Sequence, residues 1–161
     1  PIEPPNDASM SPAELYSSYF ATYVVVRLHP YHANLGKRLV KTPKLHFTET
    51  GLLTWLLQIE TAEQISRDPL LGGIFENMVV MEAVKAAYNR GVPPQLSFYR
   101  YKSGLEIDLI REYQRRPFAM EIKAGSTYVP DITKPLQRFR LLKEERMANT
   151  YTAIAKQDGD W

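Results

Sequence analysis

The stretch GLEIDLIREYQRRPFAMEIK, residues 104–123, predicts two neighbouring strands that carry acidic side chains. Side chains of a strand alternate between its two faces. In residues 105–111 the alternation places Leu105, Ile107 and Leu109 opposite Glu106, Asp108 and Ile110. In residues 118–123 it places Phe118, Met120 and Ile122 opposite Ala119, Glu121 and Lys123. Acidic residues are disfavoured inside strands, so their presence here needs a reason.

A turn through residues 114–117 would pair the two strands and bring Asp108 to the face of Glu121 and Lys123. Two carboxylates and a lysine would then converge over one sheet. A structural alternative stays open, in which the same residues form a buried ion network with an arginine in an inert α/β fold.

Length and composition limit the class of protein. The 161 residues, 44% hydrophobic and 24% charged, fit one soluble globular domain with or without an appendage. No apolar run approaches the roughly 18–20 residues that cross a bilayer, and the polar, proline-rich start does not resemble a signal peptide. We therefore expect no membrane partner. A net charge of +2 is too small to indicate nucleic-acid binding.

The chain contains no cysteine, which excludes disulfides, a thiol nucleophile and a cysteine zinc site. This fits a reducing compartment, and we expect a cytoplasmic location. Because the chain begins with Pro1 and ends just after a strand-like run, we also expect it to be a fragment of a longer protein.

Residues 1–67 are predicted to form an N-terminal extension. It contains a proline-rich tail, a strand in residues 23–28, a short strand at 45–47 and a helix over 48–59 with Thr48 as its cap. The run KRLVKTPK supplies four basic side chains without an acid: Lys37, Arg38, Lys41 and Lys44. They predict contacts with nucleic-acid phosphates, or else a solvated turn.

All three histidines, His29, His32 and His46, lie near this run. A metal site is one interpretation. Because no cysteine or acidic pair is nearby, ordinary polar residues beside a basic patch are the favoured interpretation.

Residues 68–161 are predicted to form the core, beginning with a helix over 74–90 that Gly91 closes in the left-handed conformation. Glu76 falls on the apolar stripe of this helix, with Val80 and Val84. A carboxylate there is costly unless it is paired or bound to metal. A buried salt bridge, or an acid near the helix N-terminus, would also explain it.

Three predicted strands follow, at 95–101, 105–111 and 118–123, then a helix over 131–146 with Asp131 as its cap and a strand at 151–155. The core thus has the order α-β-β-β-α-β. We expect an α/β fold in which helices flank a mixed central sheet, preceded by a small extension of hairpin and helix.

This order resembles the restriction-endonuclease-like, or PD-(D/E)XK, nucleases. The residues that carry the resemblance are Glu76 on the helix, Asp108 in EIDLI and the tripeptide Glu121-Ile122-Lys123. Ile107 stands where the superfamily's name has proline, which is a common departure.

The resemblance implies that Asp108 and Glu121 bind Mg²⁺ or Mn²⁺ with help from the Ile122 backbone carbonyl. Lys123 would be the catalytic lysine. Glu76 would orient a water molecule or support a second metal ion. Hard oxygen ligands suit these ions, and the bound ion activates water and neutralises the charge that develops at phosphate. Glu106 is a possible outer ligand or a surface charge, and Gln137 could face the site.

A narrower resemblance covers residues 28–123. The blocks LHPYHANLGKRLVKTPKLHFTETGLLTWLL, LLGGIFENMVVMEAV, FYRYKSGLEIDLI and MEIKAG are similar, in this order, to the C-terminal half, a domain of unknown function, of prokaryotic AAA-type ATPases. An ATPase domain precedes this half in such proteins. The present chain has no GxxxxGK[ST] loop, because Gly36-Lys37 lacks the upstream glycine, so we expect no ATP site in it.

The sequence therefore predicts a metal-dependent nucleic-acid phosphodiesterase. DNA and the protein's own missing ATPase domain would be its partners, with basic residues of 37–44 and 134–146 holding the nucleic-acid backbone. The alternative is a catalytically silent module that binds DNA or protein for the attached ATPase, and a third possibility is a purely structural role. No oligomeric state is predicted.

Overall fold

The computed structural model describes residues 11, 23–31, 42–101, 104–114, 116–125, 130–142 and 149–155. The elements follow the chain in the order β1 (Val25–Pro30), β2 (Lys44–Phe47), α2 (Thr50–Leu56), α3 (Ala62–Arg67), α4 (Leu71–Tyr88), β3 (Leu96–Arg100), β4 (Glu106–Tyr113), β5 (Arg116–Ala124), a 3₁₀ turn (Pro130–Thr133), α5 (Lys134–Leu142) and β6 (Asn149–Ala155). The predicted order of the core, α-β-β-β-α-β, is confirmed.

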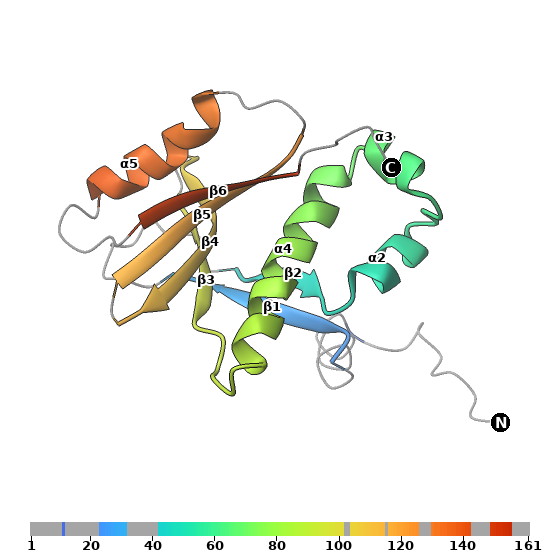
Figure 1. Cartoon of the computed structure of the whole chain (residues 1–161), viewed down its shortest axis with the longest axis horizontal. Helices are drawn as coiled ribbons and strands as arrows, with labels where there is room; N and C mark the ends of the chain where they lie inside the picture. Colours follow the sequence, from blue (N-terminus) through green and yellow to red (C-terminus); the bar gives the residue numbers. More distant parts are fainter. Residues whose placement is uncertain are drawn as a thin grey trace.

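The six strands form one mixed sheet in the spatial order β2-β1-β3-β4-β5-β6 (Figure 1). Strand β1 pairs antiparallel with β2 and parallel with β3, the pairs β3–β4 and β4–β5 are antiparallel, and β5–β6 is parallel. The mixed α/β class predicted from the sequence is therefore confirmed. Strands β1 and β2 lie in the predicted extension, yet they share the sheet of the core.

Helices α4 and α5 cover opposite faces of this sheet (Figure 1). On the α4 side, Val80 packs with buried residues of four strands: Leu28, Phe98, Leu109 and Ile122. On the α5 side, Leu136 and Phe139 pack with Tyr99, Ile107, Ile110 and Ala119. Burial of these two apolar layers holds the sheet between the helices.

The predicted alternation of β4 is wrong after Asp108. Ile107 and Ile110 both belong to the α5-side layer, whereas Leu109 belongs to the α4-side layer. The cause is a β-bulge. Ser97 pairs with Ile110 and Tyr99 pairs with Ile107, so an advance of two residues along β3 corresponds to three residues along β4. Such a bulge adds one residue and redirects the side chains around it.

Helix α4 supports the reasoning that identified Glu76. Val80 and Val84 are buried as predicted, and Gly91 has φ +68° with its N–H bonded to the Tyr88 carbonyl at 2.8 Å. The helix begins three residues earlier than predicted, at Leu71. Glu76 therefore lies beyond the first turn, which removes the explanation based on the helix N-terminus.

Two predicted caps are wrong. Helix α2 starts at Thr50 with Glu49 at its N-cap position, because the Thr48 hydroxyl donates instead to the Val24 carbonyl at 3.1 Å. Asp131 lies within the 3₁₀ turn, where its carboxylate pairs with Lys134 at 2.7 Å. The last predicted residues of α5, 143–146, lie outside the described residues. Among the helices that are described, none combines the length and the apolar character needed to cross a bilayer.

Candidate functional site

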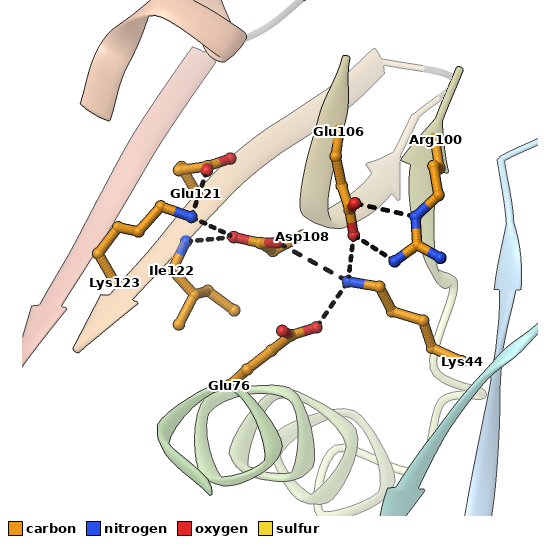
Figure 2. A network of polar contacts seen from close by, with 8 residues as sticks. All are labelled: Lys44, Glu76, Arg100, Glu106, Asp108, Glu121, Ile122 and Lys123. Carbon is orange, nitrogen blue, oxygen red and sulfur yellow. Dashed lines mark hydrogen bonds and ion pairs between the residues drawn. The ribbon is translucent and has the colours of Figure 1, made fainter. Parts of the chain in front are cut away.

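The acidic residues predicted from the sequence meet where β4 and β5 separate. The two strands pair from Tyr113–Arg116 up to Leu109–Met120, and in the described chain their ladder ends there. The next residue of β4 is Asp108. Its Oδ2 accepts a hydrogen bond from the backbone N–H of Ile122 at 2.8 Å, so that a side chain replaces the next step of the ladder (Figure 2).

The bulge in β4 explains how Asp108 reaches this position. The extra residue falls at Asp108 and Leu109, next to the point of strand separation. Bulges often redirect side chains beside functional sites. Asp108 is 6% exposed and lies between two groups of charged residues. We name them by their lysines, with Asp108 shared by both.

The Lys44 side consists of Lys44, Glu76, Glu106 and Arg100. The Lys44 ammonium lies 2.7 Å from Glu76 Oε1, 2.7 Å from Glu106 Oε1 and 3.7 Å from Asp108 Oδ1. Arg100 holds Glu106 with two hydrogen bonds, of 2.8 Å from Nε and 2.7 Å from a terminal nitrogen. Two cations thus neutralise the carboxylates on this side (Figure 2).

The pKa values on the Lys44 side reflect this pairing. Burial alone would lower the pKa of Lys44, but contacts with Glu106 and Glu76 outweigh it and raise that pKa above its ordinary value. Burial would raise the pKa of Glu106, yet hydrogen bonds from Arg100 and Lys44 lower it to about 2. Pairing therefore stabilises the charged forms of Lys44 and Glu106 against the cost of their burial.

The Lys123 side consists of Glu121 and Lys123. The Lys123 ammonium lies 2.7 Å from Glu121 Oε1 and 3.7 Å from Asp108 Oδ2. Glu121 is 4% exposed, and its second oxygen, Oε2, is buried without a hydrogen-bond partner. Burial, with a further contribution from the Asp108 charge, raises the pKa of Glu121. An unpartnered carboxylate oxygen at this depth has spare capacity for a cation.

A divalent ion fits the chemistry of the Lys123 side better than that of the Lys44 side. The carboxylates of Asp108 and Glu121 are hard oxygen donors, and the buried Oε2 of Glu121 has no hydrogen-bond partner. Within the described residues, however, no three histidine or carboxylate side chains form a ready metal-binding group. A complete coordination shell would need backbone, water or substrate oxygens, as Mg²⁺ sites commonly do.

The other predicted residues are placed as follows. Lys44 is the central cation of the Lys44 side, and its side chain is only 14% exposed. It therefore does not lie on an open basic surface. Lys37, Arg38, Lys41 and His32 are outside the described residues. His29 is exposed, whereas His46 is buried. Gln137 is exposed and its amide donates to Thr133 Oγ1 at 3.4 Å, within the turn that leads into α5.

The sequence reasoning did not identify the roles of three residues of the site. Lys44 was grouped with the basic run. Arg100 could have been found, because it directly opposes Glu106 across the hairpin of β3 and β4. Asn77 was passed over beside Glu76, although it is buried: its Oδ1 accepts from the Phe47 N–H at 2.7 Å and its amide donates to the Phe47 carbonyl at 3.0 Å. Asn77 thereby fixes the strand that carries Lys44.

Comparison with known proteins finds relatives of unknown function. A family model described as a domain of unknown function (DUF4143) matches residues 71–158, and a second domain of unknown function (DUF8612) matches residues 6–63. An uncharacterized protein of Mycobacterium bovis and one of Mycobacterium tuberculosis are each 35% identical over 132 residues, which is 81% of this chain. The chain spans only 29% of the length of these relatives. No solved structure matches it.

Proposed function

The chain belongs to the DUF4143 family, and we propose that it is a metal-dependent nucleic-acid phosphodiesterase with a restriction-endonuclease-like core. One observation carries the proposal. Asp108 and Glu121 converge at the separation of two strands, Lys123 contacts both carboxylates, and Glu121 keeps a buried oxygen without a partner. The element order from α4 to β6 supports the same fold.

In this proposal Asp108, Glu121 and the Ile122 carbonyl hold Mg²⁺ or Mn²⁺. When bound, the ion lowers the pKa of a coordinated water and offsets charge on the phosphate. The hydrogen bond from Ile122 N–H fixes the Asp108 carboxylate, so that its position does not depend on the ion. Lys123, which is 47% exposed, can reach solvent and orient the attacking water or stabilise the developing charge. Glu76 holds Lys44.

A second candidate function is a catalytically silent module that binds DNA or protein for an attached ATPase. The Lys44 side favours this alternative, because lysine and arginine already neutralise its carboxylates and no ready three-ligand group is found among the described residues. The additional length of the mycobacterial relatives leaves room for an ATPase domain in the whole protein.

A cleavage assay separates the two candidates. Supercoiled plasmid, linear duplex, single-stranded DNA and RNA are incubated with Mg²⁺ or Mn²⁺ and with wild type, Asp108→Asn or Lys123→Met. We expect cleavage by wild type, with the rate reduced at least about 100-fold in both variants. Glu82→Gln, which changes an exposed carboxylate on α4, serves as the matched control and should cleave normally.

If wild type and Asp108→Asn are equally inactive on all four substrates, the phosphodiesterase proposal is wrong. Salt-dependent DNA binding that survives in Asp108→Asn would then support the silent module, because binding to phosphates weakens with salt and does not need the carboxylate.

A further inference from the structure

Lys44 occupies a position that resembles a cation-binding site. Three carboxylates surround its ammonium, at 2.7 Å, 2.7 Å and 3.7 Å. They come from α4 and β4, whereas Lys44 comes from β2 at the far edge of the sheet. Hard oxygens from separate elements also surround a divalent ion, although the described carboxylates do not by themselves form a ready metal-binding group.

The lysine is held rigidly in this position. Strand β2 is paired with β1 from Lys44 to Phe47, and Asn77 binds both the N–H and the carbonyl of Phe47. The ammonium lies 5.5 Å from the centre of the Phe98 ring, within the range of a cation–π contact. Lys44 is therefore a fixed component of the site and not a surface side chain that happens to reach it.

Removal of this charge would leave ligands behind. Glu106 would keep its two hydrogen bonds from Arg100. Glu76 would lose its ion pair with Lys44, and Asp108 Oδ1 would lose the nearest cation on that side. The two carboxylates would then face each other across the vacated position without a positive charge, where they would repel each other and attract a cation.

We propose that the Lys44 ammonium fills a built-in cation position and keeps a second divalent ion away from Asp108. This inference rests on the proposed function, since it concerns the ion count of the same site. A two-metal site places ions about 3.5–4 Å apart around shared carboxylates. Here Asp108 is shared in the same way, but its Lys44 side already holds a protein cation, so this site takes at most one divalent ion, on the Lys123 side.

The test is a calorimetric titration of Mn²⁺ into the whole chain. Wild type is compared with Lys44→Met, which keeps the length of the side chain without its charge, and with Lys44→Gln, whose amide can still hydrogen-bond to carboxylates. Lys85→Met is the matched control, because Lys85 also lies near two carboxylates, Glu49 at 3.5 Å and Glu82 at 3.7 Å, but the lysine is only half-buried and both carboxylates are exposed.

We expect both Lys44 variants to bind one Mn²⁺ more per chain than wild type, and Lys85→Met to behave as wild type. Addition of Glu76→Gln to Lys44→Met should weaken the additional ion about tenfold or more, because it removes a charged ligand. The rise in melting temperature with Mn²⁺ is a second readout, and it should be larger in the Lys44 variants than in wild type, since ligands that bind the folded state stabilise it.

Equal stoichiometry, affinity and Mn²⁺-induced melting shift in wild type and both Lys44 variants would overturn the inference, whether or not the wild type binds an ion. If wild type binds none and the variants bind one, the role of Lys44 is upheld and the metal-dependent phosphodiesterase is the proposal that fails. If wild type and variants all bind one ion equally, the proposed role of Lys44 is wrong, and the metal-dependent phosphodiesterase is not contradicted.

Discussion

Lys44 and Lys123 approach the same Asp108 carboxylate from two sides, but in different surroundings. Lys44 is 14% exposed and contacts two further carboxylates at 2.7 Å, one of which Arg100 also holds. Lys123 is 47% exposed and contacts one further carboxylate, whose second oxygen has no partner. The Lys44 side is neutralised by the protein itself, whereas the Lys123 side keeps a buried acceptor without a partner beside a lysine that reaches solvent. Binding chemistry is therefore expected on the Lys123 side and stability on the Lys44 side.

The largest contrast should come from removal of each lysine. We expect Lys44→Met to destabilise the fold by about 3–5 kcal/mol, because it leaves partly buried carboxylates without their counter-ion. Lys123→Met should cost less, about 1–2 kcal/mol, because the Lys123 side chain is 47% exposed, although its partner Glu121 is buried. Urea unfolding in the presence of chelator measures both values. Equal losses in the two variants would contradict the distinction between the sides.

The fold should also lose stability in acid through His46, which lies on β2 two residues after Lys44. Burial, with a smaller contribution from the Lys44 charge, lowers the pKa of His46 to about 4. Below its ordinary pKa of about 6.5 the unfolded chain takes up a proton that the folded chain does not, so stability falls as the pH drops from about 6.5 to about 4. The loss attributable to His46 should be on the order of 3 kcal/mol.

His46→Leu should remove this part of the pH dependence, and urea unfolding at a series of pH values measures it. At neutral pH the variant should be no less stable than wild type, since His46 Nε2 is buried without a hydrogen-bond partner. An unchanged slope between pH 6.5 and 4 would show that other groups cause the acid sensitivity. His29→Leu, at an exposed position on the neighbouring strand, is the control.

A smaller effect is expected from the residue that holds β2 against α4. Asn77→Leu keeps the approximate volume of the side chain but removes its hydrogen bonds to the Phe47 N–H, the Phe47 carbonyl and Thr50 Oγ1. We expect a loss of about 2 kcal/mol, because partly buried backbone groups lose their partners. The variant should also bind Mn²⁺ more like Lys44→Met than like wild type if Lys44 depends on this anchor.

The smallest effect is expected from Glu121→Gln, measured with chelator present. Burial and the Asp108 charge raise the pKa of Glu121, so its ionised form is disfavoured in the fold. Neutralisation of the side chain should therefore change stability by less than about 1 kcal/mol, in the stabilising direction. The same variant should lose the Mn²⁺ affinity of the Lys123 side. A marked destabilisation would show that Glu121 is a structural ion-pair partner.

The sequence predicts local features of this fold well, because they depend on neighbours along the chain. The strands of 105–111 and 118–123, the helix with Glu76 on its apolar stripe and the left-handed Gly91 all follow from periodicity and turn chemistry. The errors arise where one element contacts another. The Thr48 hydroxyl donates to the carbonyl of Val24, just before β1, instead of capping its helix, and the bulge in β4 exchanged the faces of Leu109 and Ile110.

The site shows the same division. Alternation placed Glu121 and Lys123 together, and the hairpin placed Asp108 near them, as found. Alternation could not place Lys44, because 32 residues separate it from Glu76 and the strand order of the sheet brings them together. It also could not show that Glu76 faces this lysine, since a helical stripe gives a direction and not a partner.

The sequence by itself thus determined which side chains form the candidate site: Asp108, Glu121 and Lys123 on two adjoining strands, with Glu76 on the preceding helix. Only the tertiary structure decided how these side chains are divided between the Lys44 side and the Lys123 side. Strand β2 joins the sheet at its far edge and directs Lys44 into the acidic residues, while β4 and β5 separate and leave Glu121 with a free oxygen. The physical reason is that charge pairing depends on distances in space, and period-two or helical patterns fix those distances only within one element or one hairpin.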